Sequence, residues 1–452
     1  MIDGLQPYSE YKRSGLPWAG EVPSHWDLVP NRELLKRKKK LVGERHPDHQ
    51  LLSLTKQGVI IRDLSTGKGK FSADMGTSQE VRAGDLVFCL FDVPETPRTV
   101  GLSSHNGMIT GAYTVFECVG SATASFMELY YRAMDDRKLL SPLYSGLRNT
   151  IPPSRFLGTK TPVPPPEEQT AIVRFLDWVG RRIRRLIRAR QERIELLEEY
   201  KHAFVECCFQ EQTSRDWNRL PVCAVMRPAK RLGFPEKTLL SLFRDYGVIP
   251  KASRENKNVD VRDLAVCQLV KVGDVVMNKM KAWQGSIAVS ELEGIVSPDY
   301  MVLEVIKDEV SGRFLHFLLR SPAMVAEYRK HSYGVRPGQW RLMLDEFRRL
   351  QLVIPSLEDQ LRIAQRIDEA HARVEDATKA LRQGVSILRE LRNRLIADVV
   401  TGKLDVREAG AKLPDGPEDD EEDETLQALA DSAVNELAEV DESSAPGEEV
   451  PW

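Results

Sequence analysis

Long hydrophobic runs and paired cysteines are missing from this sequence, and their absence excludes several classes of protein. No apolar run approaches the roughly 18–20 residues that a helix needs to cross a bilayer. Residues 1–15 have no apolar core like that of a signal peptide. The six cysteines show neither a CxxC pair nor a zinc-type spacing. We therefore expect a reduced cytoplasmic protein that does not contact a membrane.

Catalytic motifs are also missing. The sequence contains no GxGxxG after a strand, no GxxxxGK[ST] phosphate loop and no HExxH zinc motif. Its eight histidines are scattered, and "NTIPPSRF" does not match the Asn/Asp-Pro-Pro-aromatic motif of amino-methyltransferases. We predict no catalytic residues, no metal site and no cofactor in this chain, and a role in recognition or assembly rather than catalysis.

Charge is distributed unevenly along the chain. The formal net charge is −3, yet residues 412–452 contain 15 acidic residues and one lysine. The remaining residues carry a net charge of +11, from 63 basic and 52 acidic side chains. This composition predicts an acidic, disordered tail at 412–452. It also predicts a basic folded body, which suits a polyanionic partner.

An internal repeat runs through the body at an offset of 187–191 residues. The matching pairs keep one order along the chain: "LLSLTKQGVI" with "LLSLFRDYGVI", "GDLVF" with "GDVVM", "YTVFE" with "YMVLE", and "FMELYYR" with "FLHFLLR". Trp26 and Pro30 likewise align with Trp217 and Pro221. At 452 residues the chain is long enough for two or three domains. We conclude that it contains two copies of one unit.

Each copy begins with a predicted mixed domain, at 26–162 and at 213–354, and residues 1–25 form an N-terminal segment. Short β-rich runs alternate with Gly and Asp turns, and "GDLVF" and "GDVVM" predict a turn that leads into a strand. "FMELYYRAM" and "FLHFLLRSP" predict short amphipathic helices. The predicted fold class is therefore α+β, with two tandem domains. We interpret the shared Gly-Asp and Tyr positions as scaffold.

A long helix is predicted after each domain, at 163–212 and 355–405. The joins "VPPPEEQTAIVRFLD" and "VIPSLEDQLRIAQRID" place proline at the helix start, where a missing N–H is tolerated. The acidic pairs that follow lie near the positive end of the helix dipole. Apolar residues spaced four and three apart predict a coiled-coil seam, which in the second helix also passes through Ala377. The seam residues are Ile172, Leu176, Val179 and Ile183 in the first helix, and Ile363, Ile367, Val374, Leu381, Leu388 and Leu395 in the second.

Two such helices in one chain most simply pair with each other, antiparallel and related by a pseudo-two-fold axis. Either this coiled coil only stabilises the protein, or it is a spacer that fixes the distance between two binding domains. The duplicated domains favour the spacer.

Several stretches together resemble the DNA-specificity subunit of type I restriction-modification enzymes. They are "YKRSGLPWAGEVPSHWDLV", "PPPEEQTAIVRFLD", "GDVVMNKMKAWQGSIAVSELEGIVSPDYMVLE", "IPSLEDQLRIAQRID" and "LIADVVTGKLDVRE". The resemblance covers nearly the whole body. The second join departs from the usual Pro-Leu-x-Glu and has Ser-Leu-Glu-Asp at 356–359. The acidic tail lies outside the family pattern.

The resemblance implies two target-recognition domains, each recognising one half of a split target in double-stranded DNA. It implies that the two long helices set the gap between the half-sites and bind two methyltransferase subunits. Those subunits would carry S-adenosylmethionine and methylate adenine N6. A motor-nuclease restriction subunit would complete the complex, and this chain would be its non-catalytic recognition subunit.

The candidate DNA-contacting residues carry the chemistry that such contacts need, since phosphate contacts need cations and base contacts need amides, cations or aromatic rings. In the second domain they are Asn278, Lys279, Lys281, Trp283, Gln284, Arg336, Gln339 and Arg341. In the first domain they are Lys56, Gln57, Lys68, Lys70, Arg98, Arg148 and Asn149. Trp283 either contacts DNA or packs on its own domain. The run "KRKKK" at 36–40 is either a phosphate patch or a solvated helix face, and we favour the helix face.

Two other functions fit the same residues less well. One is a DNA-binding adaptor that has no methyltransferase partner. The other is a structural protein in which the coiled coil is the functional part and the domains are caps. A gene neighbourhood without a methyltransferase would favour the first, and absence of DNA binding at any salt concentration would favour the second.

Overall fold

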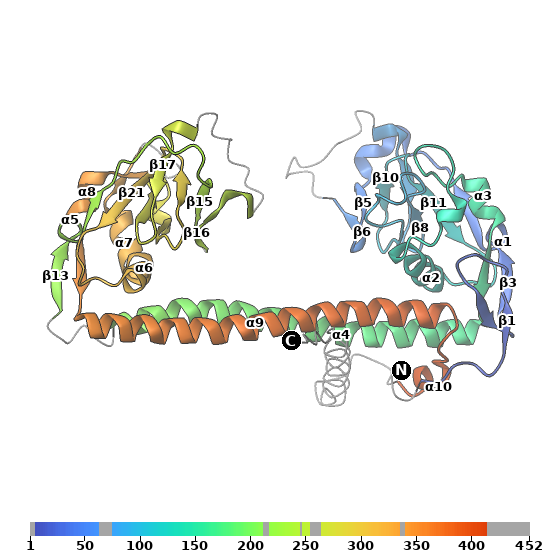
Figure 1. Ribbon diagram of the computed structural model, residues 1–452. Helices are drawn as coiled ribbons and strands as arrows, with labels where there is room; N and C mark the ends of the chain where they lie inside the picture. Colours follow the sequence, from blue (N-terminus) through green and yellow to red (C-terminus); the bar gives the residue numbers. More distant parts are fainter. Residues whose placement is uncertain are drawn as a thin grey trace, which may run out of the picture. The chain divides into compact units, whose positions relative to one another are not determined.

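The computed structural model describes residues 5–62, 75–210, 217–244, 246–253, 264–334 and 340–413. The chain divides into two compact units, one formed by Met1–Ala189 with Gln383–Trp452 and the other by Arg190–Arg382. Each unit contains one β-rich domain and a segment of each of two long helices, α4 (Pro166–Gln210) and α9 (Leu357–Val400) (Figure 1).

The first unit contains twelve named strands among its described residues. They are β1 (Tyr11–Arg13), β2 (Glu21–Pro23), β3 (Asp27–Pro30), β4 (Leu35–Lys38), β5 (Leu52–Thr55), β6 (Gly58–Ile61), β7 (Gln79–Val81), β8 (Leu86–Phe88), β9 (Val100–Leu102), β10 (Gly107–Ile109), β11 (Thr114–Cys118) and β12 (Lys160–Val163). Its shorter helices are α1 (Asn31–Leu34), α2 (Ala124–Asp136), α3 (Pro153–Gly158) and α10 (Arg407–Ala411).

The second unit repeats the order of helices and strands from β3 to α2, and then has one more helix and one more pair of strands than the first. Its strands are β13 (Asn218–Pro221), β14 (Met226–Pro228), β15 (Leu240–Phe243), β16 (Gly247–Pro250), β17 (Gln268–Val270), β18 (Val275–Asn278), β19 (Ile287–Val289), β20 (Gly294–Val296), β21 (Tyr300–Val305), β22 (Ser332–Tyr333), β23 (Arg341–Leu342) and β24 (Gln351–Ile354). Its shorter helices are α5 (Val222–Val225), α6 (Gly312–Arg320), α7 (Pro322–Lys330) and α8 (Leu344–Arg349).

The main strand pairings recur in both domains. The first domain has an antiparallel four-stranded sheet of order β4-β11-β8-β9, and the second has β14-β21-β18-β19. The two-stranded pairs also correspond, with β5–β6 matching β15–β16, β7–β10 matching β17–β20, and β3–β12 matching β13–β24. The predicted internal repeat and the predicted α+β class are therefore confirmed.

The repeated Gly-Asp pair forms the turn that precedes β8 and β18. Gly84 and Gly273 both have a φ of +91°, a conformation that favours glycine. The carboxylates of Asp85 and Asp274 are buried, and each accepts a hydrogen bond from the backbone N–H three residues earlier, at 2.8 and 2.7 Å. Both pairs therefore have a structural role.

The core of the first unit joins its β-rich domain to the long helices through α2 (Figure 1). Phe126 and Tyr130 of α2 are fully buried and belong to one apolar cluster with Phe88 of the sheet. The same cluster includes Ile172 of α4 and Leu388 of α9. The domain and the helix segments of this unit therefore share one core.

In the second unit α6 has the same position. Phe314 and Leu318 of α6 are buried in a cluster with Met277 of β18. This cluster also contains Ile363 and Ile367 of α9, and residues near the end of α4 pack against it. Both predicted amphipathic helices therefore form, and each buries its apolar side between sheet and long helices.

The long helices pack together in each unit, and most predicted seam residues are buried. The first half of α4 packs against the last part of α9 in one unit, and the last part of α4 packs against the first half of α9 in the other. This pairing is antiparallel, as expected. Leu381 is half-buried, and Ala377 is exposed while Thr378 and Val385 are buried, so the predicted seam is one position off there. The buried seam residues are Ile172, Leu176, Val179, Ile183, Ile363, Ile367, Val374, Leu388 and Leu395.

The run "KRKKK" does not lie on a helix, contrary to the interpretation favoured from the sequence. Its first residues form β4, an edge strand that pairs with β11. Lys38 pairs with the buried carboxylate of Asp85 at 2.8 Å, and Lys40 pairs with Glu80 at 2.5 Å. Pairing with β11 and with these carboxylates gives this segment an extended conformation.

Candidate nucleic-acid interface

In the second domain, two segments distant in sequence meet beside the end of β18. The loop after β18 contains a short 3-10 helix, Ala282–Gln284, and contacts β23. The backbone N–H of Leu342 donates to the carbonyl of Lys279 at 3.0 Å and joins the two segments. The structure thus brings Asn278, Lys279 and Arg341 into one place, although 63 residues separate the first from the last.

Aromatic packing gives this loop its shape. The rings of Trp283 and Trp340 meet at 5.5 Å and 62°. The indole N–H of Trp283 donates to the carbonyl of Met280 at 3.0 Å, and its own carbonyl accepts from Arg329 Nε at 3.3 Å. Trp283 was predicted either to contact DNA or to pack on its own domain, and these contacts are the ones expected for packing. Its contact with DNA stays a prediction.

The surface around this aromatic pair is chemically mixed. Lys281, Gln284 and Arg341 are exposed, so cationic and amide groups face solvent beside one another. Tyr333 of β22 pairs with Arg341 of β23 and is 61% exposed. An exposed ring beside cations and an amide suits contacts with both phosphates and bases. Neither Tyr333 nor Trp340 was among the residues selected from the sequence.

The first domain contains the corresponding pair of segments, residues 89–99 and 144–151. The backbone N–H of Ile151 donates to the carbonyl of Leu90 at 2.7 Å, which repeats the bond between β23 and the loop after β18. An ion pair also joins them here, since the Arg148 guanidinium donates to the Asp92 carboxylate at 2.5 and 3.2 Å. The N–H of Asp92 donates to the carbonyl of Arg148 at 3.0 Å.

The turn at 145–150 presents an apolar side chain to solvent. Ser145 and Thr150 close the turn through a β-bridge, and Gly146 and Asn149 both have positive φ, at +68° and +44°. Leu147 at its tip is fully exposed. Asn149, a predicted contact residue, is exposed beside it. Leu147 was not among the residues predicted from the sequence, because an apolar residue is expected to be buried and only the closed turn exposes it.

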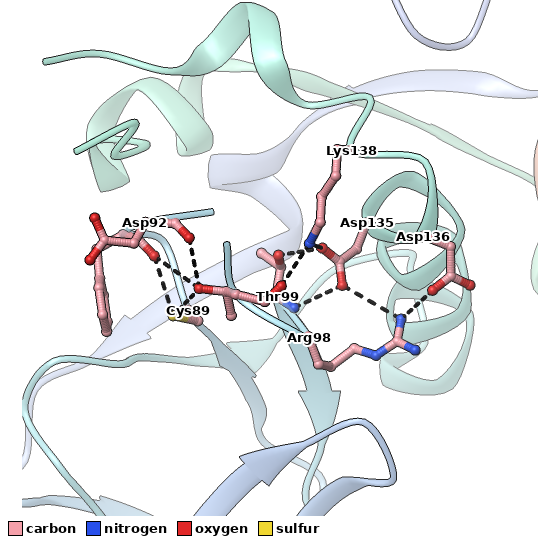
Figure 2. A network of polar contacts seen from close by, with 9 residues as sticks. Cys89, Asp92, Arg98, Thr99, Asp135, Asp136 and Lys138 are labelled. Carbon is pink, nitrogen blue, oxygen red and sulfur yellow. Dashed lines mark hydrogen bonds and ion pairs between the residues drawn. The ribbon is translucent and has the colours of Figure 1, made fainter. Parts of the chain in front are cut away.

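A buried carboxylate holds the other end of the 89–99 segment, as Figure 2 shows. Asp135 of α2 accepts from the backbone N–H of Thr99 at 2.8 Å and from Lys138 Nζ at 2.6 Å. Arg98 pairs with Asp135 at 3.5 Å and donates to Asp136 at 2.7 Å. The Arg98 side chain is only 13% exposed. These contacts give Arg98 a role in holding the loop to α2, and its predicted contact with DNA has no support from its position.

The remaining candidates lie at the edges of these segments or outside the described residues. Lys56 is exposed at the tip of the β5–β6 hairpin, beside Gln57, whose N–H donates to Thr55 Oγ1 at 3.1 Å. Four candidates fall outside the described residues: Lys68, Lys70, Arg336 and Gln339.

The glutamine of the repeated join attaches each long helix to its domain. Gln169 is fully buried, and its Nε2 donates to the carbonyls of Ser121 at 2.7 Å and Pro164 at 2.9 Å. Its Oε1 accepts from the N–H of Thr123, the N-cap residue of α2, at 2.8 Å. The sequence predicts that this glutamine belongs to a helix-start motif, but it does not predict these hydrogen bonds.

The second copy repeats all three bonds. Gln360 Nε2 donates to the carbonyls of Glu309 at 2.9 Å and Pro355 at 3.0 Å, and its Oε1 accepts from the N–H of Ser311 at 2.8 Å. Ser311 is the N-cap residue of α6. The same side chain therefore orients the domain on its long helix in both copies.

The acidic residue before each glutamine has diverged. Glu168 is buried and accepts from the Tyr8 hydroxyl at 2.6 Å and from the Trp26 indole N–H at 2.7 Å. It also meets His25 Nε2 at 2.7 Å. Burial, together with Glu168, raises the pKa of Tyr8 above its ordinary range. Asp359 instead bonds within the first turn of α9. Glu168 therefore joins the N-terminal segment to the start of α4.

Neither metal sites nor membrane spans occur in the described part of the chain. Residues 5–62, 75–210, 217–244, 246–253, 264–334 and 340–413 contain no group of three or more His, Cys, Asp or Glu side chains placed to hold a metal ion. The same residues form no helix that is both long and apolar enough to cross a membrane.

Comparison with solved structures finds the same architecture over most of the chain. A chain from work on the complex assembly and conformational transition of the type I R-M system matches with a TM-score of 0.60. At 15% identity the match covers 84% of this chain and 98% of that one. The chain therefore shares the fold of that chain of a type I R-M system.

Two further structural neighbours are specificity subunits of type I systems. The HsdS subunit from Thermoanaerobacter tengcongensis is 15% identical, with a TM-score of 0.47 over 84% of this chain and 98% of that one. The type I S subunit from M. genitalium is 12% identical, with a TM-score of 0.32 over 83% of this chain and 96% of that one. No family model matches the sequence, and no curated protein matches it.

Proposed function

We propose that this chain is the DNA-recognition subunit of a type I restriction-modification complex, without catalytic groups of its own. Each domain recognises one half of a split double-stranded target. The observation that carries the proposal is the duplication itself: two copies of one fold present loops at the same position, and the same buried glutamine fixes each copy to a long helix.

Recognition in the second domain involves the loop after β18 and the β22–β23 hairpin. Lys281 and Arg341 supply cations for phosphates or guanine edges, and Gln284 supplies an amide that can pair with adenine. The corresponding segments of the first domain present Arg148 and Asn149 beside an apolar tip. The two surfaces differ in side chains, so the two half-sites have different sequences.

The long helices act as a spacer. The two helices contain 45 and 44 residues, and at about 1.5 Å per residue each is a rod of roughly 66 Å. Half-sites that are recognised by two-fold related heads lie about 34–36 Å apart, one turn of DNA. Because Gln169 and Gln360 fix each domain to a helix start, a change in helix length changes the distance between the half-sites that bind together.

Two methyltransferase subunits and a motor-nuclease subunit are the proposed partners. The methyltransferase subunits carry S-adenosylmethionine and methylate adenine N6 within each half-site. This chain recognises the target sequence for them.

The first test is single-molecule sequencing of methylated adenines in cells that carry this gene with its neighbouring methyltransferase gene. We expect a split motif with two short half-sites, and its complete loss when this gene is deleted. The control is a strain in which the deleted gene is restored. A motif that survives the deletion would refute the proposal.

A second test addresses the spacer. Removing one heptad from each long helix, 179–185 and 370–376, keeps the 4-3 apolar pattern while shortening each rod by about 10 Å. We expect the same two half-sites with a shorter gap, or loss of methylation. Normal methylation at the original gap would show that the helices do not set it. A variant with seven substitutions to Ala or Gln at exposed positions of the long helices, and no change in length, serves as control.

A further inference from the structure

The turn at 145–150 in the first domain places a leucine at its tip, away from the core. Leu147 is fully exposed, so its whole isobutyl group faces solvent. The chain on both sides of the turn is anchored instead, since Leu143 and Ile151 are buried in the core of the first unit. Folding gains no hydrophobic stabilisation from Leu147, and only a binding partner could bury this side chain.

Hydrogen bonds hold the turn in one shape. Ser145 and Thr150 bond to each other in both directions, at 2.9 and 3.0 Å. The carbonyl of Arg148 accepts from the N–H of Asp92 at 3.0 Å, which fixes the turn to the loop after β8. Because the turn is already ordered, a contact made through its tip costs little conformational entropy.

Polar side chains next to Leu147 carry the chemistry of base recognition. The Arg148 side chain is 72% exposed and supplies a cation. Asn149 is exposed, and a side-chain amide can pair with N6 and N7 of adenine. The corresponding β22–β23 hairpin of the second domain presents the ring of Tyr333 beside Arg341. In both domains an apolar group therefore faces solvent beside a cation at this place in the fold.

A turn of this width fits the major groove of B-DNA. The groove is about 12 Å wide and admits a two-stranded β-ribbon, and the two arms of the turn are one β-bridge apart, about 5 Å. The adenine N6 that is methylated under the proposed function lies in this groove. The thymine opposite that adenine presents its C5 methyl group in the same groove, and this methyl is the apolar group that base edges offer there.

We propose that Leu147 recognises a thymine of the first half-site, by packing its side chain against the C5 methyl group in the major groove. Arg148 and Asn149 make polar contacts beside it, and no base step has to open. This contact rests on the proposed function, and it adds the residue and the chemical group that recognise each other.

The test uses the complex of the full-length chain with its methyltransferase subunits, and a duplex that contains the methylated motif found by sequencing. Each thymine of the first half-site is replaced in turn by uracil, which lacks only the C5 methyl group. One replacement should weaken binding by the wild type about fourfold, the effect of losing one buried methyl group. Leu147→Ala should bind the unmodified duplex about fourfold more weakly or worse, and the same replacement should then have no further effect.

Controls separate this contact from a structural role. Leu41→Ala replaces another exposed leucine of the same domain and should keep both the affinity of the wild type and its response to uracil. Leu147→Met keeps an apolar tip and should also respond to uracil. Leu147→Ala should unfold within about 2 °C of the wild type, because the side chain is fully exposed.

Failure of the contact can be distinguished from failure of the proposed function. If sequencing finds no split motif that depends on this gene, the proposed function fails and the thymine contact fails with it. If the motif is found but every uracil duplex binds as tightly as its parent, or if the loss persists in Leu147→Ala, only the thymine contact is overturned. A Leu147-dependent rise in 2-aminopurine fluorescence at one base step would show insertion between bases, and would overturn the methyl contact as well.

Discussion

The buried glutamines offer the sharpest test of how each domain is fixed to its long helix. Gln169→Ala removes three hydrogen bonds of 2.7, 2.8 and 2.9 Å and leaves two backbone carbonyls and one N–H without that partner. At about 1 kcal/mol for each bond, the free energy of unfolding of the first unit should fall by about 3 kcal/mol. For a unit of this size, Tm should fall by roughly 6–12 °C. Gln360→Ala should have the same effect on the second unit.

A charged substitution makes the test more specific. In Gln169→Glu the carboxylate keeps the acceptor for Thr123 but faces the carbonyls of Ser121 and Pro164, so it should destabilise the unit more than Ala does. Protonation restores a donor, so the folded state raises the pKa of this carboxyl. The variant should therefore lose stability as pH rises through that pKa and regain part of it on acidification.

Differential scanning calorimetry and urea unfolding measure these changes. The controls are Gln383→Ala and Gln191→Ala, which replace exposed glutamines on the same two helices and should change stability by less than about 0.5 kcal/mol. If Gln169→Ala unfolds within 1 °C of the wild type, the three bonds do not hold the domain to the helix. The DNA motif that the Gln169→Ala variant recognises separates stability from function. The bases of the half-sites should stay the same, while the range of tolerated gap lengths between them should widen.

Three further outcomes are expected. Arg341→Ala should weaken binding to the target duplex by about 1–3 kcal/mol if its guanidinium contacts a base, and unchanged affinity in a gel-shift assay would remove it from the interface. Asp92→Ala should change stability by less than about 1 kcal/mol, because its pair with Arg148 is partly exposed, but should lower discrimination at the first half-site only, measured with half-site mismatches. Burial lowers the pKa of His316 to about 3, below its unfolded value near 6.5, so the second unit should lose stability as pH falls from about 6.5 to 3. His316→Gln should lose less over that range in acid titrations followed by circular dichroism, and an identical loss would show that His316 does not contribute.

Much of the architecture was predictable because it depends on local patterns. The 4-3 spacing of apolar residues predicted both long helices, and the prolines and acids of the joins predicted where they begin. The offset of 187–191 residues predicted two copies of one domain, which the matching strand orders confirm. The prediction was less accurate where packing decides between neighbouring positions. Thr378 is buried in place of Ala377, because which of two adjacent residues faces the partner depends on the partner helix.

The candidate interface was only partly predictable. Residue chemistry singled out the loop after β18, and the structure brings that loop to Arg341. Chemistry alone could not distinguish Arg98, whose guanidinium is held by Asp135 and Asp136, from cations that face solvent. Leu147 was missed, because an apolar side chain becomes fully exposed only through the turn that carries it.

The sequence by itself determined the repeat, the α+β class and the two long helices, because periodicity and turn chemistry are properties of short segments. Only the tertiary structure decided how the parts are joined. The buried carbonyls and N–H groups that surround Gln169 and Gln360 come from segments about 5 and 50 residues away. A side chain that satisfies such groups can be recognised only when the fold has brought them together, because a buried polar group needs its partner in space rather than in sequence.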